Sequence, residues 1–535
     1  MKRLLPLILF LALVLRTIGL ESYPPGFTPD EASFGYDAYS ILKTGKDQWG
    51  KSFPLVLESF GDFKSPLYAY LTIPSVSIFG LNKFAVRLPN ALLGTLAVLI
   101  TYLLATKLFN RRVGLFSAFL LAISPWHVML SRGAFEANLT TFFLPLGLYL
   151  LIEKKYALSV LALGLNLFSY HSAKVVTPFV LLAFLFFFKE ELLRKKRELG
   201  VFLLVFTFFL VANLYTLRLG AGTRAVERSI TQGAVGAASE DRAALAGLVG
   251  DPVARLVHNK YTVSTKRFLE NYVTYFSPQF FFTTGPKEGT YGMIPGRGVL
   301  YWFVIPFFLG ARKLLYGGKH KKEILFLSLW VLFSAVPASL ATGVGYSANR
   351  VSGMMPGIDI LLGLGGVVVF DFLKKRKKLL YTFLFLVAVL FVSFLEDYFV
   401  QSPRKIAKDM LYGNLEVADW VSRNVEKEAS LIVDKSLSEP HIYFAFSERL
   451  EPIFYQKETG SWSYETWVDQ MPEYRLERYL FKDINASDLE KDAILIGRPQ
   501  DFNFEVKPRE IIYYPDGKEA IYVVDARSSL YAKTN

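Results

Sequence analysis

The chain contains no cysteine, and this absence removes two classes of structure. Without thiols, its 535 residues can form neither a disulfide framework nor a thiolate metal site. Charge is scarce as well, since Asp, Glu, Lys and Arg make up 20% of the residues against 52% hydrophobic. A soluble chain of this length usually forms several domains and carries more charge. The composition therefore argues against an ordinary soluble protein.

Charge is missing altogether from several long stretches. Gly200–Tyr215 and Leu379–Leu395, for example, contain no Asp, Glu, Lys or Arg. Apolar segments of this kind are typical of membrane-spanning helices, so we expect a polytopic α-helical membrane protein with about eleven spans. The expected spans are Met1–Leu20, Leu88–Leu108, Val113–Leu130, Ala137–Ile152, Tyr156–Tyr170, Val175–Phe188, Gly200–Leu217, Val299–Leu315, Ile324–Ala341, Val351–Leu373 and Leu379–Leu395. A cleaved signal peptide is the alternative for the first, but no small-x-small cleavage site follows it.

The net charge of +13 would suit nucleic acid, but the distribution of the charge excludes that partner. Lys and Arg cluster in short loops between the apolar segments, as in Lys374–Lys378. Such clusters mark the cytoplasmic side of a membrane protein and favour anionic lipid. We therefore expect a cell (plasma or inner) membrane protein with its N-terminus in the cytoplasm and its C-terminus outside.

Two regions outside the spans are expected to be external loops. The first, residues 21–81, is rich in aromatic residues and predicts interfacial helices at Asp30–Leu42 and Pro66–Phe79. The second covers residues 218–297. Its part Gly220–Gly250 is small and polar and is expected to be mobile.

The composition changes after residue 395. Residues 1–395 form the expected membrane domain, whereas residues 396–535 are more charged and show ordinary alternation of apolar and polar residues. This pattern predicts a small extracytoplasmic α/β domain. The expected elements are a helix at Asn414–Glu426 and strands at Ser430–Asp434, Ala493–Gly497, Ile511–Tyr514 and Ala520–Val524. It has no Gly-rich phosphate loop, so we expect an accessory domain.

Two adjacent carboxylates, Asp30 and Glu31, follow the first span in the motif Thr-Pro-Asp-Glu. Thr28 and Glu31 have the spacing of a helix capping box, with Pro29 at the first helical position. Capping alone is a sufficient explanation of the motif. It leaves open whether Asp30, which the box does not use, has a chemical role.

The turns on the expected outer side carry acids and bases that suit group transfer from a lipid-linked sugar phosphate. Acceptor attack needs one carboxylate as base, and an anionic phosphate leaving group needs cations rather than an acid. Asp30 as base, with Lys64 and Arg350 at the phosphate, meets this requirement. Each of these residues, taken singly, is equally explained by capping or interfacial anchoring. The charged residues expected on this side are Asp30, Glu31, Asp62, Lys64, Arg132, Glu136, His171, Lys174 and Arg350.

Other residues are expected to assist. Glu136 is a candidate to orient the acceptor or to hold a cation, and Tyr36 and Tyr68 are candidates to stack on sugar or isoprenoid. An interfacial aromatic belt is the alternative for the tyrosines. Carboxylates and His171 are possible ligands of a divalent cation, but no ligand spacing is diagnostic.

Four stretches resemble the GT-C fold glycosyltransferases of the protein O-mannosyltransferase and aminoarabinose transferase superfamily. They are Thr28-Pro-Asp-Glu-Ala, Phe63-Lys-Ser-Pro-Leu-Tyr68, Arg132-Gly-Ala-Phe-Glu136, and Asn349-Arg350 with Met355-Pro356. The resemblance implies a membrane bundle with interfacial helices and often an external C-terminal domain. It also implies a polyprenyl-phosphate sugar donor, a protein, lipid or glycan acceptor, and inversion at the anomeric carbon.

The resemblance also implies roles for particular residues. Asp30 corresponds to the catalytic acidic residue, with Glu31 beside it, and Lys64 to the residue that binds the donor phosphate. Glu136 stands where the family usually has Asp. The complete candidate set is catalytic Asp30, Glu31 and Glu136, phosphate-binding Lys64, Arg132 and Arg350, and substrate-binding Tyr36, Tyr68, His171 and Lys174.

Two other functions stay open. A lipid or solute transporter or flippase would place charge within its spans, and Asp359 is the charge that fits this alternative. A polymerase or ligase of surface glycans would use Arg and His residues in a late external loop. The loop 218–297 contains several Arg residues and His258.

Overall fold

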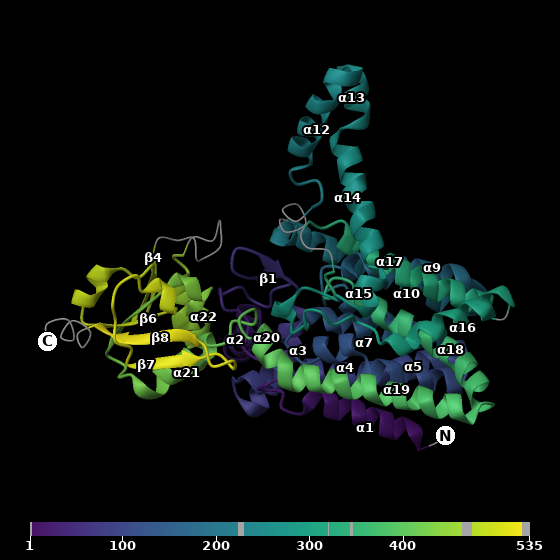
Figure 1. The fold of residues 1–535 in the computed structure, drawn as a ribbon, viewed down its shortest axis with the longest axis horizontal. Coiled ribbons are helices and arrows are strands. Elements are labelled where there is room, and N and C mark those ends of the chain that lie inside the picture. The colour runs from purple at the N-terminus through teal and green to yellow at the C-terminus, as the bar shows by residue number, and fades with distance from the viewer. Residues whose placement is uncertain (1–2, 223–228, 319, 343–345, 463–472, 527–535) are drawn as a thin grey trace.

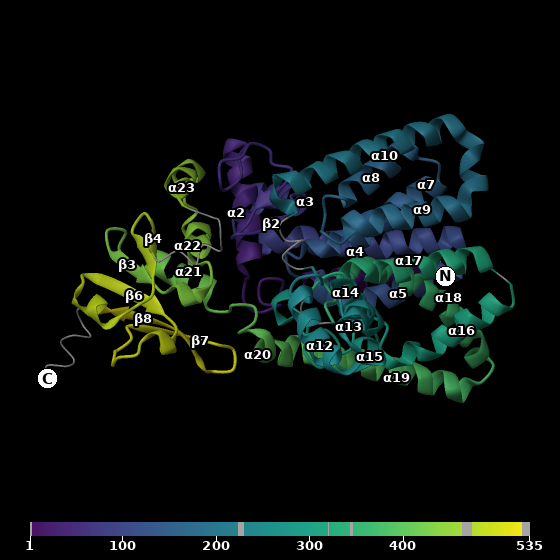
Figure 2. The same ribbon diagram turned by 90° about the horizontal axis from the view of Figure 1, so that it is seen from above.

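The computed structural model describes residues 3–222, 229–318, 320–342, 346–462 and 473–526. A bundle of roughly parallel helices makes up most of the molecule, and a β-sheet built from C-terminal residues lies beyond one end of it (Figures 1 and 2). Between the bundle and the sheet lies α2 (Pro29–Thr44). We call this end of the bundle the α2 side.

Each expected span overlaps one main helix of the bundle, and Val113–Leu130 also contains the short helix α6 (Pro125–Leu130). The main helices are α1 (Leu4–Thr17), α4 (Lys83–Leu108), α5 (Arg111–Ile123), α7 (Leu139–Ile152), α8 (Tyr156–Asn166), α9 (Ala173–Leu192), α10 (Lys196–Thr216), α16 (Ile305–Tyr316), α17 (Lys321–Ser339), α18 (Met355–Lys374) and α19 (Lys377–Glu396). Within the described residues, 5 continuous helical segments are long and apolar enough to cross a membrane, and one of them, Ala173–Gly220, contains both α9 and α10. The expectation of a polytopic helical membrane protein is confirmed.

The first loop folds as expected around two helices. They are α2 and α3 (Leu67–Phe79), and a short hairpin of β1 (Leu57–Glu58) and β2 (Phe63–Lys64) lies between them in the chain. Thr28 caps the start of α2 and Gly45, with φ of 71°, ends it. A left-handed residue at this position is a common way to end a helix, and glycine adopts it without strain.

The second loop is more ordered than its composition indicated. It forms α12 (Ala234–Val249), α13 (Asp251–Val257), α14 (Lys260–Thr274) and α15 (Pro278–Phe282). Within the stretch that was expected to be mobile, Ala234–Val249 forms a helix, because its many alanines favour a helix strongly enough to offset its glycines. Residues 223–228, which fall in the same predicted stretch, lie outside the described residues.

The C-terminal sheet has the strand order β4-β5-β3-β6-β8-β7. The parallel strands β3 (Ser430–Val433), β5 (Tyr479–Lys482) and β6 (Ala493–Gly497) form its centre, and antiparallel β4 (Glu473–Leu476), β7 (Glu510–Tyr513) and β8 (Glu519–Asp525) flank them. With α21 (Asn414–Asn424), α22 (Pro440–Glu448) and α23 (Pro452–Thr459), this is the expected α/β arrangement. Four strands were predicted, whereas β4 and β5 were missed because they are short and interrupted by charge.

The C-terminal helices pack directly on the first loop. Tyr443 of α22 donates a hydrogen bond to the carbonyl of Phe27 (2.8 Å), next to the cap of α2. Tyr36 of α2 donates in return to the carbonyl of Leu450 (2.8 Å). The ring centroids of Phe27 and Phe446 are 5.1 Å apart. These contacts hold α2 between the bundle and the sheet.

Candidate active site

The start of α2 carries the predicted capping box. The Thr28 side chain accepts a hydrogen bond from the Glu31 amide (3.3 Å), and the Glu31 carboxylate accepts one from the Thr28 amide (3.2 Å). Pro29 occupies the first turn, where its missing N–H costs nothing. The capping function of the motif is therefore confirmed.

Glu31 is fully occupied by protein groups. Its carboxylate accepts hydrogen bonds from Arg87 Nε (2.8 Å), Arg87 Nη2 (3.0 Å) and the Ala134 amide (2.9 Å), besides that from Thr28. Both Glu31 and Arg87 are 0% exposed. Burial alone favours the neutral acid, but the Arg87 charge and these hydrogen bonds outweigh it and hold the pKa of Glu31 below its usual value. Glu31 joins α2 to α4 and to the turn that contains Arg132.

Asp30 is placed quite differently from its neighbour. Its side chain is exposed, and the hydrogen bond it accepts among the described residues is a long one, from Ser59 Oγ to Oδ1 (3.4 Å). Ser59 lies in the turn between β1 and β2. Of the two adjacent carboxylates, Asp30 is the one with free lone pairs and access from outside.

Lys64 of β2 points at the next turns of α2. Its ammonium donates to Ser33 Oγ (2.8 Å) and lies 4.0 Å from the Asp37 carboxylate. Asp37 is 0% exposed and Lys64 is 3% exposed. The Gln48 amide also donates to Asp37 (3.1 Å). Burial raises the pKa of Asp37 to about 7, although the Lys64 charge acts to lower it.

Asp37 was missed at the sequence level. A signal for it was present, because residues 30, 33 and 37 have the i, i+3, i+7 spacing of one helix face. Asp37 lies two turns along α2 from Asp30. Lys64 packs on the same face, at Ser33, which lies between them in the helix. The polar face of α2 thus carries two acids, and the buried Lys64 of β2 packs on it.

A cavity of about 280 Å³ lies on the α2 side of the bundle. Its polar lining includes two predicted residues, His171 and Arg350, together with Glu288 and Asn349. Its apolar wall comes from α9 and from the end of α17, at Val175, Pro337, Ala338, Leu340 and Ala341. A cationic group opposite an apolar wall suits a ligand with a charged head and a hydrocarbon tail.

Glu288 of the second loop was not a predicted site residue. Its carboxylate accepts hydrogen bonds from Ser347 Oγ and from the Asn349 amide (3.2 Å). Burial raises the pKa of Glu288, with these hydrogen bonds and the Arg350 charge acting against it. Glu288 and Arg350 are far apart in the sequence, so no local motif could have brought them together.

His171 connects the cavity to the first loop. The carbonyl of Phe63 lies 3.1 Å from His171 Nε2, and a carbonyl can only accept, so this nitrogen carries the hydrogen. Phe63 directly precedes Lys64 in β2. On the opposite side, the rings of Phe135 and Tyr291 are 5.6 Å apart, and Tyr291 lines the cavity. Half-buried Glu136 follows Phe135, at the start of its 3₁₀ turn.

Four of the predicted residues are held by other parts of the fold. Arg132 is buried and donates to the carbonyls of Leu15 (2.6 Å), Ile18 (2.5 Å) and Tyr23 (3.2 Å), near the end of α1. Tyr36 is buried against the C-terminal helices, and Tyr68 is buried with its hydroxyl on the carbonyl of Val86 (2.9 Å). Lys174 donates to Thr216 Oγ1 (3.4 Å). These contacts engage the four side chains with other protein groups, and three of them, Arg132, Tyr36 and Tyr68, are 0% exposed.

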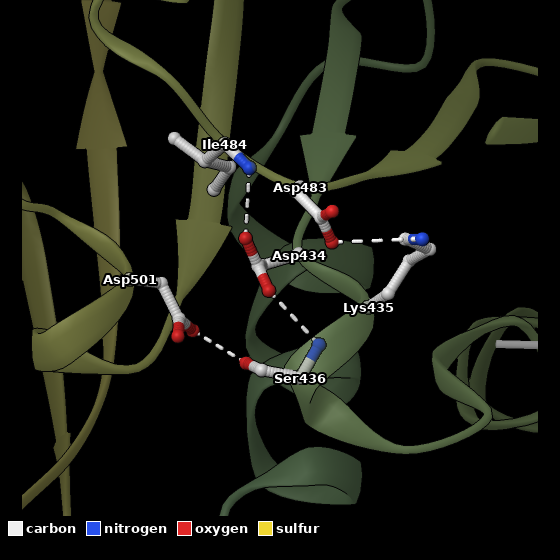
Figure 3. A pocket seen from close by; sticks show the side chains of 6 residues that line it. All are labelled: Asp434, Lys435, Ser436, Asp483, Ile484 and Asp501. Carbon is white, nitrogen blue, oxygen red and sulfur yellow. Dashed lines mark hydrogen bonds and ion pairs between the residues drawn. The ribbon is translucent and has the colours of Figure 1, made fainter. Parts of the chain in front are cut away.

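A second cavity lies at the carboxyl ends of the parallel strands, where Asp434 follows β3 and Asp483 follows β5 (Figure 3). Its acids are paired within the protein. Asp434 accepts from the amides of Ser436 (2.9 Å) and Ile484 (2.8 Å), and Asp501 accepts from Ser436 Oγ. Lys435 lies 3.6 Å from Asp483. These contacts account for the charges without a ligand.

No group of three or more His, Cys, Asp or Glu side chains that could hold a metal ion occurs within the described part of the chain. On the polar face of α2, the Lys64 ammonium contacts both Ser33 and Asp37.

Comparisons with known proteins agree with this architecture. Residues 63–215 match the family model described as dolichyl-phosphate-mannose-protein mannosyltransferase. An uncharacterized protein of Aquifex aeolicus (strain VF5) is 30% identical over 226 residues, which are 40% of this chain and 44% of that protein. The match thus spans less than half the length of this relative.

Two solved structures share the fold along almost the whole chain. ArnT from Cupriavidus metallidurans bound to undecaprenyl phosphate matches with a TM-score of 0.54 and 12% identity, over 97% of both chains. The apo state of the same protein gives a TM-score of 0.55 and 11% identity, over 98% of both. At this identity the likeness shows the fold alone, which is the fold that the resemblance implied.

Proposed function

We propose that this protein is an inverting glycosyltransferase that moves a sugar from a polyprenyl-phosphate donor to an acceptor hydroxyl or phosphate group. Transfer takes place at the outer face of the cell membrane, with the N-terminus in the cytoplasm and residues 396–535 outside. The observation that carries the proposal is the contrast between the neighbours Asp30 and Glu31. The Glu31 carboxylate is hydrogen-bonded to Arg87 and two backbone amides. Asp30 is exposed at the start of α2, which is packed between the bundle and the C-terminal helices.

Asp30 acts as the base in this proposal. Its carboxylate takes the proton of the acceptor group as the acceptor oxygen attacks the anomeric carbon. The bond to the donor phosphate breaks on the opposite face of the sugar, which inverts the configuration. Polyprenyl phosphate leaves as an anion and needs no general acid, so a single carboxylate suffices.

Arg350 binds the donor phosphate in the cavity. It faces Glu288 and His171 there, and the apolar wall at Val175 and Pro337 receives the first part of the prenyl chain. The structure of similar fold that is bound to undecaprenyl phosphate supports a lipid of this class. A guanidinium is well suited to the task because it stays charged and binds phosphate oxygens in pairs.

Lys64 supplies a second positive charge for the donor phosphate. In the conformation described here its ammonium is held by Ser33 and Asp37. The pKa of Asp37, raised to about 7, leaves this carboxyl partly neutral at physiological pH, which weakens its hold on Lys64. Lys64 can then turn to the phosphate when the donor arrives. Glu136 orients the acceptor.

The two alternatives have less support among the described residues. His258, the candidate of a glycan polymerase or ligase, lies 3.7 Å from Asp241 on the hairpin of α12 to α14, and it does not line the cavity. Asp359, the candidate of a transporter, is a single buried carboxylate near the start of α18.

The proposal is tested by lipid analysis of cells that lack the protein. If the protein consumes a polyprenyl-phosphate sugar, that lipid accumulates in the deletion strain and disappears again when the wild-type gene is restored. Restoring the Asp30→Asn variant, with its membrane level matched by immunoblot, should leave the lipid elevated. An unchanged profile of polyprenyl-linked sugars in the deletion strain would overturn the proposal.

A further inference from the structure

A helical hairpin, residues 234–274, projects from the bundle at a right angle. It rises away from the bundle helices in Figure 1 and is seen end-on in Figure 2, where the same helices again run horizontally. The hairpin consists of α12 and α13 on one arm and α14 on the other. Because the bundle helices cross the membrane, a hairpin perpendicular to them runs parallel to the membrane plane.

Hydrogen bonds fix the depth at which α14 leaves the bundle. Asn271 Nδ2 donates to the carbonyls of Ser339 and Ala341 (3.3 Å each), at the end of α17. The Tyr272 hydroxyl donates to the carbonyl of Leu332 (3.2 Å), which lies about two turns, roughly 10 Å, further into α17. The base of the hairpin therefore lies beside the final turns of a membrane-spanning helix, not above them.

The face of α14 that contacts α17 is apolar, and it continues beyond that contact. On a helical projection Tyr261, Phe268, Leu269, Tyr272 and Val273 share one side. Charged residues occupy the other side, namely Lys260, Lys266, Arg267 and Glu270. The apolar side is solvent-accessible along the hairpin, with exposures of 72% for Tyr261, 53% for Leu269 and 64% for Val273.

The tip of the hairpin repeats this arrangement. Leu248 and Leu256 are 83% and 77% exposed, among the most exposed large apolar side chains of the described residues. In α13, Val253 and Leu256 lie on one side, and Asp251 and Arg255 form an ion pair on another (2.6 Å). So many exposed large apolar side chains on one short hairpin are uncommon unless something covers them.

We propose that the hairpin of residues 234–274 lies in the membrane interface on the α2 side, with the apolar side chains of α13 and α14 among the lipid acyl chains. The bilayer is the occupant that fits, because the same side of α14 already contacts α17 at membrane depth. The attraction is hydrophobic rather than electrostatic, since the charges of the hairpin nearly balance. Its cations are Arg242, Arg255, Lys260, Lys266 and Arg267, and its anions are Glu240, Asp241, Asp251 and Glu270. This inference does not depend on the proposed transfer reaction.

The natural absence of cysteine makes the test direct, because single-cysteine variants need no background changes. Leu256→Cys and Leu269→Cys are labelled with an environment-sensitive fluorophore in the full-length protein. The protein is then reconstituted into phosphatidylcholine vesicles with and without a nitroxide on an upper acyl carbon. Both labels should shift to shorter emission wavelength and lose emission in the nitroxide vesicles.

Two matched labels serve as controls. Glu270→Cys lies next to Leu269 on the charged side of α14, and Lys518→Cys is an 81% exposed site in the C-terminal sheet region. Neither should lose emission to the same degree. The proposal is overturned if the labels at 256 and 269 behave like the label at 518. It is equally overturned if their shielding depends on protein density and not on the lipid nitroxide, since a second copy of the chain would then cover the surface.

Discussion

Arg87 and Glu31 form a buried pair that fastens the first loop to the bundle. Arg87 donates to both oxygens of Glu31, at 2.8 and 3.0 Å, and its remaining N–H groups donate to the carbonyls of Leu20 (3.1 Å), Pro24 (2.9 Å) and Gly26 (2.8 Å). One guanidinium of α4 thus holds both Glu31 and the chain leading into α2. The position of Asp30 follows from this pair.

Replacing Glu31 by Gln should destabilise the fold. The substitution removes the negative charge and leaves Arg87 buried with no counter-charge, and breaking a buried pair in this way costs about 3–5 kcal/mol. Thermal unfolding of the protein in detergent, followed by tryptophan fluorescence, should show a clearly lower midpoint. Asp30→Asn is the matched control, and an exposed site of this kind should change stability by no more than about 0.5 kcal/mol.

If both variants unfold at the wild-type temperature, the Arg87–Glu31 pair does not stabilise the first loop. If Asp30→Asn were the less stable of the two, the assignment of structural and chemical roles to the neighbours would be reversed.

The Asp30→Asn variant should fold and insert normally but fail in catalysis. An amide cannot accept the acceptor proton, and loss of a positioned base typically costs about 10²- to 10⁴-fold in rate. The measurement is the initial rate of sugar transfer by purified protein from a polyprenyl-phosphate sugar, at saturating donor. A rate within a factor of about two of wild type would contradict the role of Asp30 as base.

Much of this arrangement could be predicted from the sequence, and the reasons differ from element to element. The spans and the capping box are local patterns, so each apolar run became a helix and Thr28 bonded Glu31 as its spacing indicated. Local sequence could not tell which of Asp30 and Glu31 is paired within the protein and which is exposed. The pairing depends on Arg87, whose distance from the motif in the sequence gave no reason to connect the two.

The cavity was even harder to predict from the sequence. It is formed by four separate segments, around residues 171, 288, 337 and 350, that meet only in the folded bundle. Arg132 shows that a charged residue can have partners that the sequence does not reveal. A cation next to a family-like motif suggested phosphate binding, whereas the fold uses it on the carbonyls of Leu15 and Ile18. Charge alone does not distinguish a ligand-binding arginine from one that closes a helix end.

Replacing Arg350 by Gln should weaken binding of the donor more than binding of the acceptor. Charge-assisted hydrogen bonds contribute about 1.5–3 kcal/mol, which corresponds to about 10- to 100-fold in affinity. The measurement is donor KM against acceptor KM in the transfer assay, together with direct binding of polyprenyl phosphate. Arg297→Gln is the control, because Arg297 pairs with Asp397 (2.7 Å) and does not line the cavity. An equal loss for both substrates would count against a phosphate role for Arg350.

The last prediction concerns pH and rests on Asp37. The pKa of this buried carboxyl is raised to about 7, so the folded protein holds the proton more tightly than the unfolded chain does. The stabilisation from this proton is complete below about pH 4 and is lost as the pH rises towards 7. The pKa of Asp47, raised by burial to about 6, acts in the same direction. The wild-type unfolding midpoint should therefore fall across this interval.

In the Asp37→Asn variant the group can no longer ionise, so the fall should be smaller, by an amount on the order of a few kcal/mol. Thermal unfolding of both proteins at closely spaced pH values measures the difference. Asp47→Asn provides the comparison, since it should reduce the fall between about pH 4 and pH 6 and leave a fall between about pH 6 and pH 7. Superimposable profiles for wild type and Asp37→Asn would mean that Asp37 is already ionised throughout. Its hold on Lys64 would then be permanent, and the release of Lys64 to a donor phosphate would have to be abandoned.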